Sequence, residues 1–430
     1  MVDIRRTHYA NQLNESLVGS NVRIAGWVED LRDLGSLLFL TVRDASGTAQ
    51  VIVSDEQKLN SAKSITRQSV VAISGSVQKS KAKAFPVEVK AGEITVLTNA
   101  IHPLPVDPTG RVGASIDLRL DARALDLRNP RVLSLFRIRH EASQSIRKTL
   151  VANQFIEVNT PKIIGSASEG GANLFSLEYF GKKAYLAQSP QLYKEQLTMA
   201  LDRVFEIAAY YRAEKSHTVR HLNEFISVDI EAAFMDAEDV MEVAEQVVRN
   251  VLADVKEKCV DDLKQVGSEI TVPSLPFEKL TYLQVLDELK KEGADLEFGE
   301  DLPDQALRVL GEKRKGYYWI VDWPLKLKPF YIHEKESNPE LSSSFDLQYG
   351  YLELASGGRR QHDVKKLKAR LQEQGLNPKD FEDHLKVFEW GMPPHSGWGL
   401  GFDRLMMVLC NANNIREVVL YPRDTERLKP

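Results

Sequence analysis

The sequence predicts an α+β protein, in which a small N-terminal β-barrel precedes a larger domain with helices flanking an antiparallel sheet. Two observations support this class. Short runs rich in Val, Ile, Leu and Thr fill residues 1–103, whereas helical periodicity and grouped strands, without regular βαβ alternation, fill residues 131–430. Between them, residues 102–113 hold three prolines and two glycines, which suits an extended linker. We therefore predict domains over 1–103 and 131–430, joined by a hinge over 104–130.

The N-terminal domain has the order of elements expected for an OB fold. Ser46-Gly47 marks a hairpin turn, and the polar segment 56–65 suits a short helix or loop after the third strand. The five expected strands span residues 22–33, 37–44, 48–54, 69–77 and 93–100. Five strands with a helix after the third are typical of an OB barrel, a common oligonucleotide-binding module. Another small barrel without a ligand would show the same pattern, so both interpretations stay open.

The second domain begins with a long amphipathic helix. Apolar residues recur at spacings of three and four from Leu133 to Leu150, and a strand bounded by Pro161 follows. A second helix is expected at about 237–258, before a mixed α/β stretch. The other expected strands of the first half span residues 182–189, 203–214 and 224–234.

Composition narrows the class of protein. The chain has 430 residues, 43% of them hydrophobic, and two cysteines, which excludes a disulfide framework and a four-cysteine zinc site. No apolar stretch approaches the roughly 20 residues of a membrane span, and the N-terminus lacks a signal region. Residues 1–103 carry a net charge of +2 within a chain of −5, which permits local phosphate contact only. We expect a cytoplasmic enzyme, without a membrane or DNA partner.

Two arginine-containing segments suit a polyphosphate. Arg212 and Glu214 lie two apart on an expected strand, and Arg220, His221 and Leu222 lie in the loop that follows. Two arginines on one strand-loop-strand element can bind phosphates, although a solvated charged hairpin explains the pattern as well.

The segment HSGWGLGFDRL places Gly401, Phe402, Asp403 and Arg404 at the start of an expected helix, which can favour an anion. Taken alone, its glycines are better explained by a structural turn.

Further polar residues could form a binding site. Glu353 lies three residues before Ser356, so that a carboxylate and a hydroxyl could meet a hard cation. Arg360 follows two glycines and could bind a carboxylate with its planar fork. Beside other strands, Glu169, Gln191 and Lys194 offer polar groups, each of which alone could be surface decoration.

The order and wording of these segments resemble one family. FIEVNTPKI with its preceding helix, FEIAAYYRAE with RHLNEF, and GLGFDRL are similar to the three motifs of class II aminoacyl-tRNA synthetases. From RTHYANQL to REVVLYPRDTERLKP, the whole chain resembles aspartyl-tRNA synthetases of the archaeal and eukaryotic type. The stretch between Phe234 and Glu353 is too short for the large insertion of bacterial aspartyl enzymes. Asparaginyl enzymes usually carry alanine where Pro190 stands in QSPQLYKE, so the wording favours aspartate.

The resemblance implies a two-step ligase that activates L-aspartate with ATP and then charges tRNA(Asp). Lys194 and Arg360 would hold the substrate side-chain carboxylate, and Arg212 would bridge the reacting carboxylate and the α-phosphate. The implied aspartate-binding residues are Glu169, Gln191, Lys194, Arg212, Ser356 and Arg360; those implied for catalysis are Lys194, Arg212 and Arg404. An asparaginyl-tRNA synthetase, and a non-catalytic synthetase-like RNA-binding paralogue, are the two rivals.

The resemblance also implies how ATP would be held. Glu353 and Ser356 would bind Mg²⁺, and Arg404 would meet the γ-phosphate. The implied ATP-binding residues are Arg212, Glu214, Arg220, His221, Leu222, Glu353, Gly401, Phe402, Asp403 and Arg404. The family also forms homodimers through the helix and strand that end near Pro161.

In this family the barrel reads the anticodon. Phe39 would stack on a base and Gln50 would hydrogen-bond the central uracil, unless Phe39 is a residue of the barrel core. Glu29 and Lys83 occupy the positions that separate tRNA(Asp) from tRNA(Asn). Lys83 matches relatives that discriminate, whereas Glu29 matches neither pattern. The sequence therefore favours, narrowly, a choice of tRNA(Asp) alone.

Overall fold

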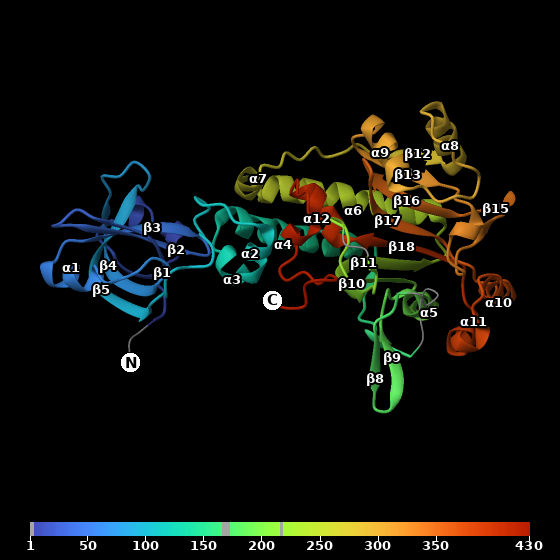
Figure 1. Ribbon diagram of the computed structural model, residues 1–430, viewed down its shortest axis with the longest axis horizontal. Helices are drawn as coiled ribbons and strands as arrows, with labels where there is room; N and C mark the ends of the chain where they lie inside the picture. Colours follow the sequence, from blue (N-terminus) through green and yellow to red (C-terminus); the bar gives the residue numbers. More distant parts are fainter. Residues whose placement is uncertain (1–3, 166–172, 216–217) are drawn as a thin grey trace. The chain divides into compact units, whose positions relative to one another are not determined.

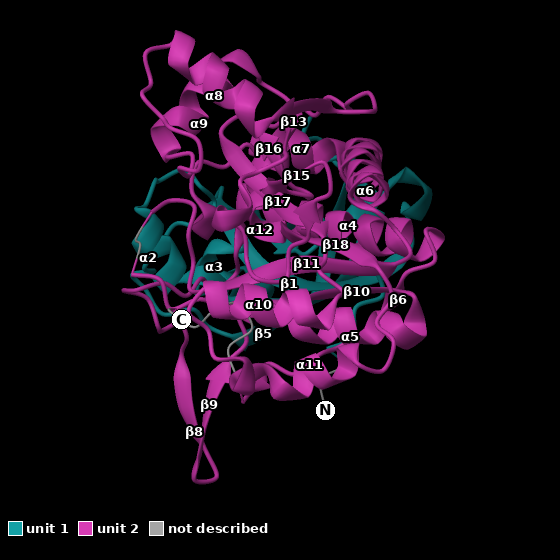
Figure 2. Ribbon diagram, turned by 90° about the vertical axis from the view of Figure 1, so that its right-hand side faces the viewer, with its two compact units in different colours: residues 1–129 teal, residues 130–430 magenta. Residues whose placement is uncertain are grey.

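The computed structural model describes residues 4–165, 173–215 and 218–430. The chain divides into two compact units, Met1–Asn129 and Pro130–Pro430, which Figure 2 shows in teal and magenta. Each unit has its own hydrophobic core. The α+β class predicted from the sequence is confirmed. No helix in the described part of the chain is long and apolar enough to cross a membrane.

The first unit is a closed five-stranded barrel, which confirms the OB fold. The strands pair in the order β1-β2-β3-β5-β4, so that β3 and β5 run parallel and β4 closes onto β1. A short helix separates β3 from β4, as the sequence predicts. The elements of this unit are β1 (Asn21–Asp33), β2 (Leu38–Asp44), β3 (Gly47–Val53), α1 (Glu56–Ala62), β4 (Val70–Lys79), β5 (Val87–Thr98), α2 (Ile116–Asp121) and α3 (Arg123–Asp126).

One strand of the barrel begins earlier than expected. β5 starts at Val87 and not at residue 93, because Val87, Val89 and Ala91 point into the barrel core. Pro86 and Gly92 interrupt the run of β-formers in the sequence, which hid this alternation.

The second unit is built on an eight-stranded sheet of order β12-β13-β16-β17-β18-β11-β10-β6 (Figure 1). Its inner strands are antiparallel, and the pairs at both edges, β12 with β13 and β10 with β6, are parallel. The strands of this sheet are β6 (Ile156–Glu157), β10 (Arg203–Tyr211), β11 (Glu224–Ala233), β12 (Glu278–Thr281), β13 (Tyr317–Val321), β16 (Ser344–Tyr349), β17 (Leu352–Arg359) and β18 (His395–Gly401).

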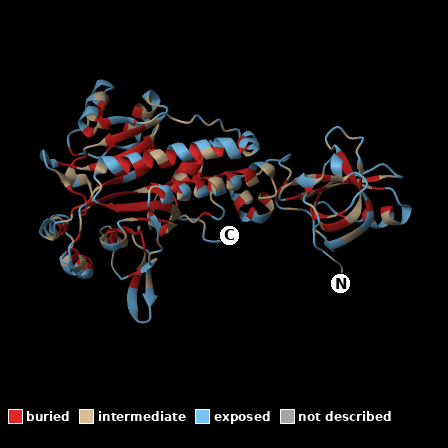
Figure 3. Cartoon of the chain, turned by 180° about the vertical axis from the view of Figure 1, so that it is seen from behind, coloured by how far each residue is buried: buried red, intermediate tan, exposed pale blue. Residues whose placement is uncertain are grey.

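One face of the sheet is covered by two long helices, α4 (Pro130–Ala152) and α6 (Ala237–Lys258), which pack against each other. Figure 3 shows the buried residues gathering on the sheet and on the helix faces turned toward it. On β11, Val228 and Ile230 belong to this core. Because side chains alternate along a strand, Ser227, Asp229 and Glu231 lie on the opposite face. The fold therefore carries a row of buried polar residues behind its main core.

The second unit also contains smaller elements. They are β7 (Ile163–Ile164), β8 (Ser176–Tyr179), β9 (Lys182–Leu186), α5 (Gln191–Leu201), α7 (Val260–Val266), α8 (Tyr282–Lys291), α9 (Asp304–Lys313), β14 (Glu334–Lys335), β15 (Asn338–Ser342), α10 (Val364–Glu373), α11 (Glu382–Phe388) and α12 (Phe402–Leu409). In Figure 1 the β8–β9 hairpin extends away from the sheet.

Several expected strands of the second unit are shorter than predicted, among them the one expected at 182–189, which ends at Leu186 as β9. The strand expected around Pro161 is reduced to β6 and β7. β10 ends at Tyr211, so Arg212 and Glu214 follow the strand and do not lie on it. The strand ends there because the Asn223 side chain takes over the hydrogen bonding: its Nδ2 donates to the carbonyls of Arg212 and Glu214.

Candidate active site

The polar face of the sheet is made possible by glycines in β18. Gly397 lies opposite Glu231 and Gly399 opposite Asp229. A Cβ atom at Gly397 would overlap the Glu231 carboxylate, and one at Gly399 would lie 3.0 Å from Asp229 Oδ1. These glycines therefore belong to a strand and leave room for two carboxylates, which corrects their interpretation as a turn.

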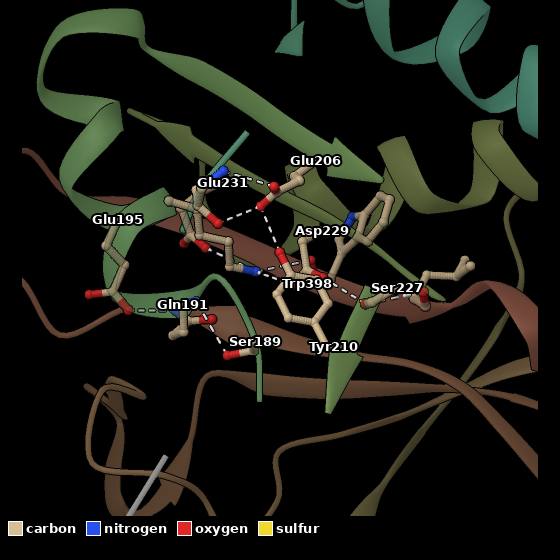
Figure 4. A network of polar contacts seen from close by, with 12 residues as sticks. Ser189, Gln191, Glu195, Glu206, Tyr210, Ser227, Asp229, Glu231 and Trp398 are labelled. Carbon is tan, nitrogen blue, oxygen red and sulfur yellow. Dashed lines mark hydrogen bonds and ion pairs between the residues drawn. The ribbon is translucent and has the colours of Figure 1, made fainter. Parts of the chain in front are cut away.

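Two cations and two carboxylates form a buried cluster on this face; Figure 4 labels the carboxylates, Asp229 and Glu231. Lys194 Nζ lies 2.9 Å from Asp229 Oδ1 and 3.5 Å from Glu231 Oε2. The Arg360 guanidinium donates to both Glu231 oxygens at 2.9 and 3.3 Å. None of these four residues is more than 4% exposed. The sequence predicted the two cations but not their pairing with Asp229 and Glu231. These two acidic residues are two positions apart on one strand, and this spacing could have indicated that they share a face.

The cluster borders a pocket with a volume of about 340 Å³. Most of the predicted site residues line it: Gln191, Lys194, Arg212, Glu214, Arg220, His221, Leu222, Glu353, Ser356, Arg360, Gly401, Asp403 and Arg404. Glu169 lies outside the described residues. Phe402 is buried in the main core under the Arg139 guanidinium and does not line the pocket. The structure thus brings together residues that are up to 213 positions apart, from Gln191 to Arg404.

Neighbouring backbone groups, aromatic rings and a carboxylate fix the positions of two arginines of the pocket. Arg212 N–H donates to the Asn223 carbonyl, and its guanidinium lies 5.2 Å from the centre of the Phe225 ring. Arg220 pairs with Asp304 and lies over the Tyr351 ring. His221 Nδ1 lies 2.6 Å from Thr218 Oγ1, and burial together with the Arg404 charge lowers the pKa of this imidazole. The pocket therefore presents fixed positive charge beside a neutral His221.

Carboxylates on neighbouring strands provide the candidate cation site. Arg404 Nη1 donates to the Glu353 carbonyl at 3.0 Å and lies 3.7 Å from its carboxylate. Burial and the nearby Asp346 charge raise the pKa of Glu353. Asp346 Oδ2 accepts from Lys328 at 2.8 Å, but its buried Oδ1 has no hydrogen-bond partner among the described residues. Repelling carboxylates with an unpartnered oxygen fit a hard cation such as Mg²⁺.

Asp346 was missed by sequence reasoning. It lies opposite Ser356 across the β16–β17 pair, and only this pairing brings it near Glu353.

A second polar face lies on the barrel. On β2, Leu38, Leu40 and Val42 point into the core, whereas Phe39 is half-buried on the outer face and is therefore not a core residue. Thr41 pairs with Gln50, so Phe39 and Gln50 are diagonal neighbours on this face. Gln50 Nε2 donates to Glu88 at 2.5 Å and to Ser80 at 3.2 Å. Sequence reasoning missed Glu88, because the parallel pairing of β3 with β5 was not visible in it.

The two positions expected to separate tRNAs have different surroundings. Glu29 is the extra residue of a β-bulge in β1, and its carboxylate pairs with Arg43 on β2. Lys83 is exposed in the loop before β5, and within the described residues its side chain forms neither a hydrogen bond nor an ion pair. Neither side chain is thus held ready to contact a base.

The chain matches two protein-family models and full-length relatives. A model described as tRNA synthetases class II (D, K and N) matches residues 115–425, and one described as OB-fold nucleic acid binding domain matches residues 22–97. The aspartate–tRNA(Asp/Asn) ligase of Methanothermobacter thermautotrophicus is 46% identical over 433 residues, covering 100% of this chain and 99% of that protein. The enzyme of the same name from Saccharolobus solfataricus is 45% identical, covering 99% and 100%.

A solved structure supports the same grouping. The asparaginyl-tRNA synthetase from Pyrococcus horikoshii, complexed with asparaginyl-adenylate, superposes with a TM-score of 0.94 at 33% identity, covering 99% of this chain and 100% of that chain.

Proposed function

This chain belongs to the class II tRNA synthetases (D, K and N), and from that membership we propose that it is an aspartate–tRNA ligase. It activates L-aspartate with ATP to aspartyl-adenylate and pyrophosphate, and then transfers the aspartyl group to the 3′ end of tRNA(Asp). The observation that supports aspartate over asparagine is the pair of buried cations, Lys194 and Arg360, at the pocket. Although Asp229 and Glu231 balance their charge, both cations present N–H donors at the pocket; a carboxylate offers them two acceptor oxygens, whereas an amide offers one oxygen and an NH₂ group that cannot accept.

The first step needs positioning and charge stabilisation but no side-chain base, because a carboxylate is already a nucleophile. Lys194 and Arg360 bind the side-chain carboxylate of aspartate, while Arg212 contacts both the reacting carboxylate and the α-phosphate. Glu169 is proposed to meet the α-ammonium group, and Gln191 helps by accepting a hydrogen bond from it. Arg404 contacts the γ-phosphate end of ATP. The support for these roles is the common pocket that all of them except Glu169 line.

The remaining proposed ATP contacts lie beside these residues. Glu214 and the segment 220–222 line the ATP side of the pocket, where Gly401 ends β18 and Asp403 and Arg404 lie in the first turn of α12. Glu353 and Ser356, with Asp346 behind them, would hold Mg²⁺. When bound, the metal ion supplies charge neutralisation on the phosphates. We propose a cytoplasmic location, where ATP and tRNA are both available.

Pyrophosphate exchange tests the proposed function. We expect exchange that depends on aspartate and ATP, with asparagine supporting little or none. Exchange with asparagine alone would indicate the asparaginyl rival, and no exchange with either amino acid would contradict the proposal.

We propose that the barrel reads the anticodon through Phe39, which stacks on a base, and Gln50. Glu88 fixes the Gln50 amide with its Nε2 already engaged. Its Oε1 is then left to accept from the N3–H of a uracil.

The choice of tRNA is proposed to be broad. The relatives from M. thermautotrophicus and S. solfataricus carry names that include both tRNA(Asp) and tRNA(Asn). The Glu29 carboxylate is paired with Arg43, and the exposed Lys83 side chain has no hydrogen bond or ion pair within the described residues. Neither side chain is therefore positioned to reject the third anticodon base. These observations outweigh the narrow sequence preference for tRNA(Asp) alone.

We therefore expect purified tRNA(Asp) and tRNA(Asn) to be charged with kcat/KM values within about tenfold of each other, a difference of roughly 1.4 kcal/mol. Lys83→Ala is the control and is expected to leave this ratio unchanged. A preference above about 100-fold for tRNA(Asp) would restore the narrower choice. Comparable charging would require a partner amidotransferase that converts Asp-tRNA(Asn) to Asn-tRNA(Asn).

We also propose a homodimer. In the second unit, α4 and the short strands after it leave apolar side chains exposed: Val151 at 60%, Ile156 at 47% and Ile163 at 48%. A second copy of the chain would cover this surface. Sedimentation at micromolar concentration is expected to give about twice the chain mass of 48.5 kDa, whereas a species at 48.5 kDa would contradict the dimer.

A further inference from the structure

Behind Gln191, one turn further along α5, lies a buried carboxylate that does not reach the pocket. Glu195 is fully buried, and its Oε1 accepts from Gln191 Nε2 at 2.5 Å (Figure 4). Gln191 itself lines the pocket. A carboxylate accepts hydrogen bonds only, so it dictates which end of the Gln191 amide points toward it.

This hydrogen bond determines which end of the Gln191 amide faces the pocket. With Nε2 donating to Glu195, the carbonyl oxygen Oε1 is the end left over for the pocket. Within the described part of the chain this oxygen has no hydrogen-bond donor. An acceptor of this kind suits an ammonium group, whereas the flipped amide would present two N–H groups and repel it.

Two histidines with different protonation face the second oxygen of Glu195, as charged or polar neighbours beyond hydrogen-bond geometry. Its Oε2 lies 3.5 Å from His384 Nε2 and 3.8 Å from His395 Nε2. The Gln196 amide nitrogen donates to His384 Nδ1, so a neutral His384 carries its proton on Nε2, facing Glu195. His395 Nδ1 lies 2.8 Å from the Pro393 carbonyl and must therefore carry a proton. Its Nε2 faces a carboxylate favourably only if it is protonated too.

The surroundings of His395 support a charged ring. Burial alone would lower the pKa of His395, but Glu195 and, further away, Glu231 raise it above the usual value. His362 also faces this ring, and Arg360 donates its backbone N–H to the His395 carbonyl. With His395 protonated, the buried network holds three cations, Lys194, Arg360 and His395, against the carboxylates of Asp229, Glu231 and Glu195.

We propose that Glu195, held by His384 and by a protonated His395, is a positioning residue that fixes the Gln191 amide so that its oxygen receives the substrate α-ammonium group. The proposal rests on the aspartate-binding role of Gln191 under the proposed function. Glu195 touches no substrate and acts through Gln191.

The first test compares Glu195→Met and Glu195→Gln in pyrophosphate exchange. Because a hydrogen bond to a charged group is lost, Glu195→Met is expected to raise the KM for aspartate by about 10- to 100-fold, with the KM for ATP nearly unchanged. Glu195→Gln keeps an acceptor and is expected to have a smaller effect. The matched control is Glu245→Gln, since Glu245 is another buried carboxylate with two donors, Trp319 Nε1 and Phe277 N–H, and does not line the pocket.

The second test exchanges the two groups. Gln191→Glu places two carboxylates against each other and is expected to weaken aspartate binding. The double variant Gln191→Glu/Glu195→Gln restores one donor and one acceptor in the opposite order. Its KM for aspartate is therefore expected to be at least tenfold lower than that of Gln191→Glu alone. Purely additive effects of the two substitutions would overturn the proposal.

A third measurement needs no activity. In protein labelled with ¹³C at His Cε1, the His395 resonance, identified by its loss in His395→Gln, is expected to titrate at higher pH in the wild type than in Glu195→Gln. An unshifted titration would contradict the Glu195–His395 pair. If aspartate supported no exchange in the wild type, the proposed function would fail while this titration could still succeed, so the two failures are distinguishable.

Discussion

Replacing Lys194 with methionine, or Arg360 with leucine, is expected to lower kcat/KM for aspartate-dependent pyrophosphate exchange by about 30- to 5,000-fold. Each substitution removes a donor for the substrate carboxylate and leaves Asp229 or Glu231 without its buried partner. Truncating one member of a buried, hydrogen-bonded charge pair costs roughly 2–5 kcal/mol. The KM for ATP is expected to change little, because neither cation belongs to the proposed phosphate side of the pocket.

Arg416→Leu is the matched control for Arg360→Leu. Arg416 is also a buried arginine, and its Nε lies 2.6 Å from Asp424 Oδ2, but it does not line the pocket. We expect this variant to lower the melting temperature while its KM for aspartate stays near the wild-type value. Wild-type exchange in both pocket variants would refute the assignment of the carboxylate site.

Arg212→Ala is expected to slow formation of the adenylate in a single turnover by about 100- to 1,000-fold, the usual loss when one fixed donor to a developing charge is removed. The effect is expected mainly in kcat, because negative charge at the α-phosphate grows in the transition state. The hydrogen bonds that join the Arg212 backbone to Asn223 do not depend on the arginine side chain, so the loop is expected to keep its conformation.

Arg212→Lys separates charge from geometry. Lysine restores the charge but not the planar fork, so we expect recovery of only a small part of the rate. Arg203→Ala, at the other end of β10, is the control and is expected to leave the rate unchanged, since Arg203 donates to the Asn153 carbonyl and does not line the pocket. An Arg212→Ala rate within threefold of wild type would remove Arg212 from the proposed mechanism.

Local signals in the sequence were sufficient for much of the fold. The helix expected at 237–258 has these same limits in the structure, because Asp236 and Asp239 cap its start and a buried stripe of valines follows. The barrel was predictable because its strands alternate buried and half-buried residues in short, well-separated runs.

The rest depended on pairings between distant strands. The sequence indicates that Lys194 and Arg360 are cations of the site, but their pairing with Asp229 and Glu231 requires α5 to pack on β11 and the sheet to have the strand order β17-β18-β11. Asp346 and Glu88 were missed for the same reason, since each meets its neighbour only across a strand pair. Sequence spacing cannot reveal such contacts, because it does not determine which strands pair or in which register.

The separate hydrophobic cores of the two units have an evolutionary consequence. Substitutions on the outer face of the barrel change the free energy of folding of the first unit. Among the described residues, the core of that unit is separate from the core of the second unit, which carries the pocket. Under the proposed function, the choice of tRNA and the choice of amino acid can therefore evolve independently. A lineage can widen or narrow the set of tRNAs that it charges without changes in the aspartate pocket.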